Sequence, residues 1–243
     1  MSSTDNVVLC MKWGTKYGPE YVNHLYAMVK KNLSLPFRFV CLTDDASGLR
    51  EEVETYPIPS LDLPEGIPER GWKKLAVFRE DLYGLKGNAL FLDVDIVIVG
   101  SLDAFFQEPG EFLIIHDWKR PWRITGNSSV FRFRLGGYPD ILKKFIRTQA
   151  EVRKNFRNEQ AYLSKEMHDR GVMKYWPKEW CQSFKYHCLR RFPLNFFLEP
   201  RIPGNAKVLV FHGETNPHDA LVGRSNRMLR YMRPASWIKN YWH

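Results

Sequence analysis

The sequence has few cysteines, no internal repeat and no long apolar run. No uninterrupted apolar stretch approaches the ~20 residues that span a bilayer, and the N-terminus lacks the basic and apolar regions of a signal peptide. Of the four cysteines, Cys10 and Cys41 lie inside apolar runs, where a thiol behaves as a small hydrophobic group, so we expect no disulfide framework. We expect a cytoplasmic protein that can attach peripherally to the inner face of the cytoplasmic membrane.

Nucleic-acid motifs are also missing. The sequence has no C-x-x-C zinc pattern and no aromatic signature of an RNA-recognition motif. Its formal net charge is nevertheless +9, with the basic residues spread along the chain. This charge favours anionic partners such as nucleotides, phosphorylated glycans or an acidic membrane surface, and we expect no nucleic-acid partner.

The 243 residues, of which 44% are hydrophobic, predict one globular domain with a sizeable core. The first half of the chain alternates apolar strand-like runs with helical spacing, which favours an α/β fold with a mostly parallel central sheet and helices on both faces, in the manner of Rossmann folds. Strands are predicted at residues 7–12, 37–42, 89–99, 112–116, 130–133 and 207–211, and helices at 21–33, 72–82, 139–155 and 158–170. Residues 224–243 are basic and aromatic, and we expect them to attach to a surface or to act as a lid.

Two carboxylates interrupt the most apolar of these strands. Asp93 and Asp95 lie within the run ALFLDVDIVIV of residues 89–99, and a strand would direct both side chains to one side. Because burying an ionised carboxylate costs several kcal/mol unless a cation or strong donors compensate it, the pair predicts a bound divalent cation. His212 directly follows the strand at 207–211, and two carboxylates with one imidazole suit Mn²⁺ or Mg²⁺, with diphosphate oxygens and water completing the octahedron.

Other polar residues also stand at predicted strand ends, where open α/β sheets bind ligands. Trp13 could stack on a base or belong to the core, and Asp44 could hold the base or ribose or cap a turn. Asn127 could contact a ligand or serve the turn beside Gly126. Each of these alternatives stays open at the level of sequence.

Five short motifs occur in an order that resembles a known family. They are Lys74-Leu75, the strand of residues 90–95, Gly-Asn-Ser-Ser at 126–129, Glu159-Gln160, and Phe-His-Gly at 211–213. Together they resemble the nucleotide-sugar glycosyltransferases of the GT-A fold, especially family 8, which includes glycogenin and bacterial lipopolysaccharide galactosyltransferases. The resemblance spans residues 7–219 and implies a single GT-A-like domain that moves a hexose from a nucleotide-diphosphate sugar, with uridine as the expected base, to a glycan acceptor such as a lipopolysaccharide core, with retention of configuration.

The resemblance also implies roles for individual residues. Asp93, Asp95 and His212 would hold the metal, and Asp95, Glu159 and Gln160 would be catalytic. Residues of the motifs and of the strand ends would bind the donor: Trp13, Gly14, Thr15, Asp44, Lys74, Asp93, Val94, Asn127 and Ser128. Basic and aromatic stretches would suit an anionic acceptor through Trp122, Arg123 and Lys185.

The chain departs from the family pattern at two places. The family's Asp-Gln pair is Glu159-Gln160 here, one methylene longer. The family's lysine after the histidine is missing, because residues 212–218 read HGETNPH. Arg224 is a candidate replacement for that lysine at the diphosphate.

Three other functional classes compete with this interpretation. Residues 93–97 also fit the nucleophile strand of haloacid-dehalogenase phosphohydrolases, but that nucleophile belongs on the first strand and no downstream Gly-Asp-x-x-x-Asp motif is present. A nucleotidylyltransferase would need a glycine-rich N-terminal loop followed by arginine, whereas residues 12–16 read KWGTK. A non-catalytic binding module would not need a carboxylate pair in an apolar strand.

Overall fold

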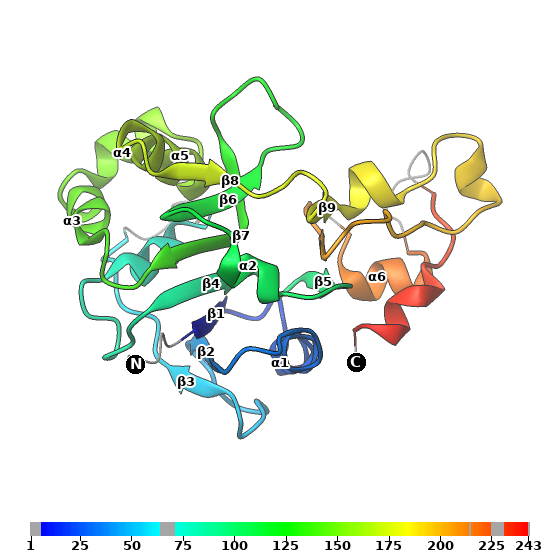
Figure 1. Ribbon diagram of the computed structural model, residues 1–243, viewed down its shortest axis with the longest axis horizontal. Coiled ribbons are helices and arrows are strands. Elements are labelled where there is room, and N and C mark those ends of the chain that lie inside the picture. The colour runs from blue at the N-terminus through cyan, green and yellow to red at the C-terminus, as the bar shows by residue number, and fades with distance from the viewer. Residues whose placement is uncertain (1–5, 64–70, 214, 225–230, 243) are drawn as a thin grey trace.

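The computed structural model describes residues 6–63, 71–213, 215–224 and 231–242 (Figure 1). Its central sheet has seven strands in the order β3-β2-β1-β4-β7-β6-β8. These strands are β1 (Asn6–Lys12), β2 (Phe37–Thr43), β3 (Glu54–Tyr56), β4 (Asn88–Leu92), β6 (Phe112–His116), β7 (Gly126–Arg134) and β8 (Met173–Tyr175). Four of the six pairings are parallel, and only β7 runs antiparallel to both of its neighbours, so the predicted mostly parallel sheet is confirmed.

A second, smaller sheet lies beside the first (Figure 1). Its three strands follow the order β5-β10-β9, with β5 at Ile96–Ile98, β9 at Cys181–Ser183 and β10 at Val208–Val210. The helices are α1 (Pro19–Asn32), α2 (Asp103–Gln107), α3 (Pro139–Arg147), α4 (Gln149–Asn155), α5 (Glu159–Asp169) and α6 (Pro217–Val222). Short 3-10 helices cover Trp72–Phe78, Leu194–Phe196 and Ser236–Asn240, and one π-helical turn covers Phe184–Cys188.

Both faces of the central sheet are buried, as a parallel sheet requires. Alternate residues of β1 enter two separate apolar cores: Val8 and Cys10 pack towards α1, whereas Val7 and Leu9 pack towards α3 and α5. All four cysteines are free and buried, so the expectation of no disulfide framework is confirmed.

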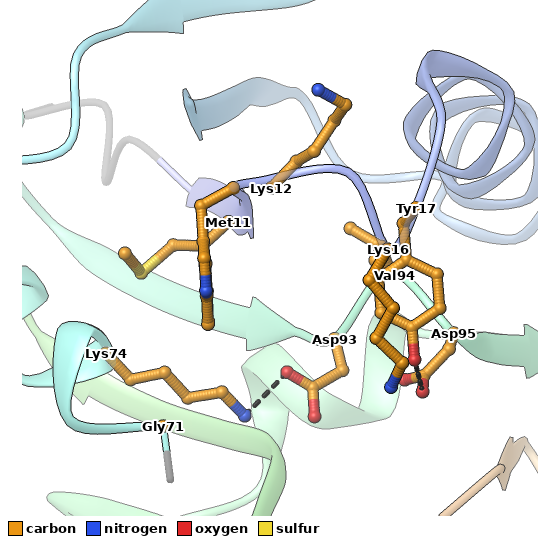
Figure 2. Close-up of a pocket in the computed structure, with 10 residues that line it drawn as sticks. Met11, Lys12, Lys16, Tyr17, Gly71, Lys74, Asp93, Val94 and Asp95 are labelled. Atoms are coloured by element: carbon orange, nitrogen blue, oxygen red, sulfur yellow. Dashed lines mark hydrogen bonds and ion pairs between the residues drawn. The ribbon is translucent and has the colours of Figure 1, made fainter. Parts of the chain in front are cut away.

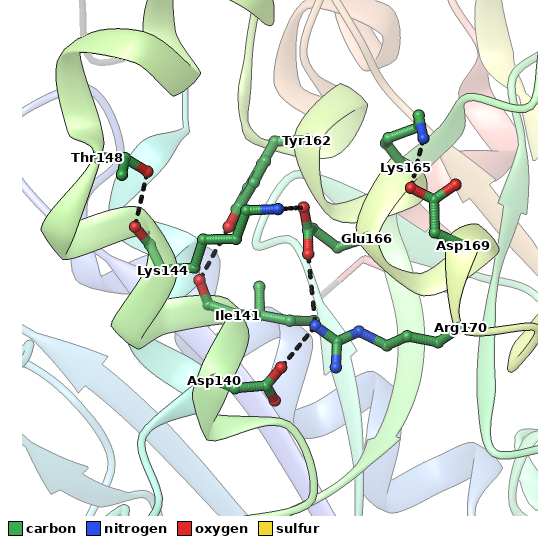
Figure 3. Close-up of polar contacts among 9 residues, drawn as sticks. All are labelled: Asp140, Ile141, Lys144, Thr148, Tyr162, Lys165, Glu166, Asp169 and Arg170. Atoms are coloured by element: carbon green, nitrogen blue, oxygen red, sulfur yellow. Dashed lines mark hydrogen bonds and ion pairs between the residues drawn. The ribbon is translucent and has the colours of Figure 1, made fainter.

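Polar contacts join the helices on the second face (Figure 3). Arg170 at the end of α5 pairs with Asp140 of α3 at 2.6 Å and also reaches Glu166, which in turn pairs with Lys144 at 2.6 Å. The Tyr162 hydroxyl donates to the carbonyl of Ile141 at 3.0 Å. These contacts join α5 to α3, and the Ser164 hydroxyl of α5 accepts from the Gly126 amide at the start of β7 at 2.8 Å.

The predicted strand at residues 89–99 is wrong in one respect that matters for function. The strand stops at Leu92 and β5 begins at Ile96, because the chain leaves the central sheet and enters the smaller one. Asp93 and Asp95 therefore lie in the connection between two sheets rather than side by side on a strand. The predicted helix at 139–155 is likewise divided at Thr148, and the predicted helix at 72–82 is a 3-10 helix that ends at Phe78.

The C-terminal segment packs on the domain over most of its described length. Residues 225–230 and 243 lie outside the described residues, but Met232, Ile238 and Trp242 are buried. The Trp242 ring lies 5.3 Å from that of Tyr21 on α1. Those apolar side chains are therefore not available to a membrane surface. Among the described helices none is long and apolar enough to cross a membrane.

Candidate functional site

An open pocket of about 240 Å³ lies where the two sheets meet (Figure 2). It forms at the carboxyl ends of β1 and β4, the position at which open α/β sheets bind ligands. The residues that line it come from three segments far apart in sequence: Met11, Lys12, Trp13, Lys16, Tyr17, Gly71, Lys74, Asp93, Val94 and Asp95. The acidic pair and Lys74, all predicted to be functional, therefore share one cavity.

Asp93 is held by its backbone and by its side chain. Its amide donates to the carbonyl of Ser129 at 2.9 Å, which ties the residue to β7 just beyond the end of β4. Its carboxylate pairs with the Lys74 ammonium at 2.6 Å, and the two side chains are 22% and 13% exposed (Figure 2). A buried pair of this kind fixes the carboxylate in one position.

Lys74 stands between two carboxylates. Its burial alone would lower its pKa, but the charges of Asp93 and Glu159 outweigh that effect and raise it, so the side chain stays charged. Glu159, at the first position of α5, is buried and accepts a short hydrogen bond from the Ser128 hydroxyl. Burial raises the pKa of Glu159, against the opposing effects of Lys74 and Ser128. The expected neighbours Lys74, Ser128 and Glu159 thus form one network with Asp93.

Asp95 is the second carboxylate of the pocket. The Tyr17 hydroxyl donates to it at 2.6 Å and also approaches the Asn216 side-chain oxygen at 3.4 Å (Figure 2). Burial, followed by the charge of Asp93, raises the pKa of Asp95 to about 6. Burial and the neighbouring Asp93 carboxylate thus outweigh the opposing effects of the Tyr17 hydrogen bond, Lys16 and Lys74 on the pKa of Asp95.

His212 does not join the carboxylates in this structure. Its Nε2 atom lies 2.7 Å from the Ser183 hydroxyl, and its ring stacks on Trp118 at 5.7 Å. Within the described part of the chain, no group of three His, Cys, Asp or Glu side chains is placed to hold a metal ion. The expected three-residue metal set is therefore not assembled, although the ladder of β10 and β5 ends with Val210 opposite Ile96, next to Asp95.

Of the other expected donor residues, Trp13 and Val94 line this pocket, whereas Gly14, Thr15, Asp44, Asn127 and Ser128 are not among its lining residues. Asp44 accepts a hydrogen bond at 2.9 Å from the amide of Gly14, which has a positive φ of 62° and precedes the exposed Thr15. Gln160 accepts from the amide of Ser128 at 3.4 Å. The Asn127 side chain accepts from the Ser129 amide at 3.1 Å within β7, so the turn that was the alternative to a ligand contact is not present.

Lys16 and Lys74, and not Arg224, place positive charge beside the carboxylates of the pocket. Lys12 also lines the pocket, but its ammonium donates to the Asp45 carbonyl at 3.2 Å. Arg224 has a 65% exposed side chain, whose guanidinium lies 3.9 Å from the Asp219 carboxylate, and it is not among the residues that line the cavity. Lys12 and Lys16 do line it, beside Lys74. Sequence reasoning missed Lys12 and Lys16, although both flank the loop that directly follows β1.

The expected acceptor residues lie apart from one another. Trp122 is 77% exposed and stands with Arg123 in the loop between β6 and β7. Lys185 lines a separate small cavity together with His212 and Thr215. The structure does not bring these three residues into one site.

Comparisons with known proteins identify the fold. No family model matches the sequence, and no curated protein matches it. The galactosyltransferase LgtC, solved with donor and acceptor sugar analogs, matches with 13% identity and a TM-score of 0.64 over 96% of this chain and 94% of that one. The apo form of the glycosyltransferase GlyE of Streptococcus pneumoniae TIGR4 matches with 14% identity and a TM-score of 0.61, over 88% of this chain and 56% of that one.

A eukaryotic structure matches as well. The apo form of mouse xyloside xylosyltransferase 1 has 13% identity and a TM-score of 0.53, over 86% of this chain and 98% of that one. Identities this low establish the shape of the molecule and leave its substrates open. The chain has the GT-A fold of these glycosyltransferases, and the resemblance to family 8 is confirmed at the level of the fold.

Proposed function

We propose that this protein is a metal-dependent glycosyltransferase that moves a hexose from a nucleotide-diphosphate sugar, with uridine as the base, to a glycan acceptor. One observation carries the proposal. In a GT-A fold, Asp93 and Asp95 line an open pocket at the strand ends with Lys74 paired to Asp93 at 2.6 Å. Acidic and basic groups in one cavity suit a diphosphate and its counter-ion better than a neutral ligand.

The carboxylate pair fits a divalent cation. Asp93 and Asp95 offer hard oxygen donors of the kind that Mg²⁺ and Mn²⁺ prefer. A cation between them would neutralise the charge of Asp93, which, after burial, raises the pKa of Asp95. When bound there, the metal would stabilise the negative charge of the departing diphosphate. Asp93 and Asp95 would hold it, whereas His212 is bonded to Ser183 and is not placed to do so in this conformation.

The chain's own residues would place the diphosphate next to that cation. Lys74 keeps its positive charge and cannot move freely, because Asp93 and the Ser128 carbonyl both contact its ammonium. Lys16 lines the same cavity and would take the place of the family lysine that this chain lacks after His212. Glu159 is buried and bonded by Ser128, so we assign it to the positioning of Lys74 rather than to contact with the sugar.

The acceptor is proposed to be an anionic glycan such as a phosphorylated lipopolysaccharide core. The proposal rests on the net charge of +9 and on the exposed basic loop around Trp122 and Arg123. We further propose transfer with retention of configuration, which the resemblance to family 8 implies. NMR of the anomeric proton in the first-formed product would show whether the configuration is retained.

A panel of nucleotide sugars tests the proposed activity. With Mn²⁺ present, we expect hydrolysis of one uridine-diphosphate hexose, loss of that hydrolysis on chelation, and a loss of at least 100-fold in Asp95→Asn, which keeps the size of the side chain and the Tyr17 contact. Hydrolysis of no nucleotide sugar, or hydrolysis unaffected by chelator, would overturn the proposal. The phosphohydrolase alternative gains no support, because the matching structures are glycosyltransferases and the aspartates lie after the fourth strand of the chain.

A further inference from the structure

A loop beside the smaller sheet exposes several large apolar side chains to solvent. The amide of Arg201 donates to the carbonyl of Cys188 at 2.9 Å, which closes the segment between them into a loop of the compact, self-contained kind. In this loop Phe192 is 82% exposed and Phe197 is 72% exposed. Leu194, Phe196 and Leu198 are also exposed. Hereafter we call residues 189–200 the apolar loop; it lies in the yellow-to-orange part of the ribbon at the right of Figure 1.

Hydrogen bonds hold the apolar loop in a defined conformation. Inside it, the amides of Phe197 and Leu198 both donate to the Leu194 carbonyl, at 3.1 and 2.9 Å. At its base, the Trp237 indole donates to the Pro200 carbonyl at 2.8 Å, and the Ser236 hydroxyl donates to Glu199 at 2.9 Å. The fold therefore presents these apolar side chains to solvent in a fixed arrangement.

Three of the exposed rings contact one another. The Phe196 ring stacks on Tyr231 at 5.1 Å and meets the Phe192 ring edge-on at 6.0 Å. Tyr231 is itself 43% exposed. Soluble monomers seldom leave a contiguous group of large apolar side chains exposed unless it meets a partner or a membrane.

Three arginines lie at the two ends of the apolar loop in the sequence. Arg190, Arg191 and Arg201 line a hollow of about 500 Å³ together with Leu194. The only acidic residue of the apolar loop, Glu199, faces its base, where it accepts from Ser236. An apolar tip with guanidinium groups at its base matches the two layers of an anionic bilayer, in which acyl chains lie beneath phosphate head groups.

We propose that the apolar loop docks the protein on an anionic phospholipid bilayer. Phe192 and Phe197 enter the interface, and the arginine hollow binds lipid phosphates. Charge complementarity favours this occupant over a second copy of the chain, because two copies would bring like-charged arginines together. The buried apolar residues of the C-terminal segment, such as Met232 and Ile238, are not needed for this contact.

Vesicle flotation of the full chain tests the proposal without any sugar donor. We expect binding to phosphatidylcholine vesicles that contain phosphatidylglycerol, weaker binding to phosphatidylcholine alone, and weaker binding at high salt. The double variant Phe192→Ser with Phe197→Ser should bind at least tenfold less, as should Arg191→Glu with Arg201→Glu. Ile146→Ser is the matched control, because Ile146 is an exposed apolar residue on α3, away from the loop, and it should bind as wild type does.

Circular dichroism melts confirm that each variant folds, since Phe192 and Phe197 make few contacts to lose. Failure of the wild-type chain to bind either vesicle would overturn the proposal, and so would unchanged binding by the double phenylalanine variant. Sedimentation velocity tests the alternative occupant, a second copy of the chain. If the wild-type chain binds no vesicles but self-associates, and the double phenylalanine variant does not self-associate, the loop joins two copies instead.

Discussion

The Lys74 ammonium is the counter-charge of two buried carboxylates, those of Asp93 and Glu159. Replacing it in Lys74→Met keeps the length of the side chain but leaves both acids without a nearby cation. Because removing one partner of a buried ion pair leaves an uncompensated charge, we expect a loss of about 3 kcal/mol of unfolding free energy. Nucleotide-sugar hydrolysis should also fall at least 100-fold. Urea unfolding and a hydrolysis assay measure the two effects.

Lys143→Met is the matched control, because Lys143 pairs with Glu80 at the same 2.6 Å distance but both side chains are more than two-thirds exposed. Solvent screens such a pair, so its loss should leave stability and hydrolysis unchanged. Equal loss of stability in the two variants would contradict the role of Lys74 as a buried counter-charge.

Asp95 makes the stability of the metal-free protein depend on pH. Its pKa is about 6 in the fold and 3.8 ordinarily, because burial and Asp93 outweigh Lys16, Lys74 and the Tyr17 hydrogen bond. The folded state therefore binds more protons than the unfolded chain between about pH 4 and 6, and this contribution to stability is lost as the pH rises through that range. Asp95→Asn should be the more stable protein above pH 6 and should match wild type below pH 4. Urea unfolding from pH 4 to 7 in chelator measures this difference; a constant difference across the range would count against it.

At the scale of elements, the sequence predicted the strands better than the connections between them. The alternating apolar pattern of residues 7–12 and 37–42 matches β1 and β2 within one residue at each end. The run at residues 89–99 concealed a change of sheet, since its apolar periodicity continues through the break at Asp93 and cannot say which sheet each half joins. The short strands β3, β8 and β9 have only three residues each and form by pairing with neighbouring strands, so local sequence periodicity did not predict them.

Gly71 precedes one element of the site and lies close to another. It precedes the 3-10 helix at Trp72–Phe78, has a φ of +80°, and a Cβ there would stand 2.6 Å from the Glu159 carboxylate on α5. Gly71→Ala should therefore lose about 1 kcal/mol for its left-handed backbone and a further amount for the clash, and it should reduce donor hydrolysis by displacing Glu159. Gly84→Ala shares the positive φ, at +70°, but a Cβ there meets nothing within 4 Å. Thermal unfolding of Gly71→Ala and Gly84→Ala separates the cost of the backbone conformation from the cost of the clash. Equal unfolding midpoints would show that the Glu159 side chain moves aside without loss of stability.

At the scale of the whole molecule, the α/β class, the GT-A fold and the neighbourhood of Lys74, Asp93, Ser128 and Glu159 followed from ordered motifs in the sequence. The partners of His212 did not, because a side-chain rotamer and a contact to Ser183, 29 residues away, leave no mark on local sequence. The exposure of the apolar loop was hidden for a similar reason. Its composition resembles that of a core segment, and only tertiary structure decides whether such a segment is covered.

The net charge of +9 affects donor and acceptor differently. The donor diphosphate would be met by partly buried groups such as Lys74, whereas an anionic acceptor would meet exposed side chains such as Arg123, which salt screens. Raising the salt concentration should therefore weaken transfer to a phosphorylated core oligosaccharide more than it weakens donor hydrolysis. Steady-state kinetics against ionic strength measures both, and an acceptor KM that is indifferent to salt would exclude the anionic acceptor while leaving the transferase proposal intact.

The central claim is that Asp93 and Asp95 hold a divalent cation that binds a nucleotide diphosphate. Titration calorimetry of UDP into the protein, with and without Mn²⁺, tests it most directly because it requires neither the sugar nor the acceptor to be known. We predict saturable binding in the presence of Mn²⁺, binding at least tenfold weaker in chelator, and the same weak binding in Asp95→Asn with Mn²⁺ present. Binding of equal affinity with and without the metal, or in the variant and the wild type, would contradict the claim.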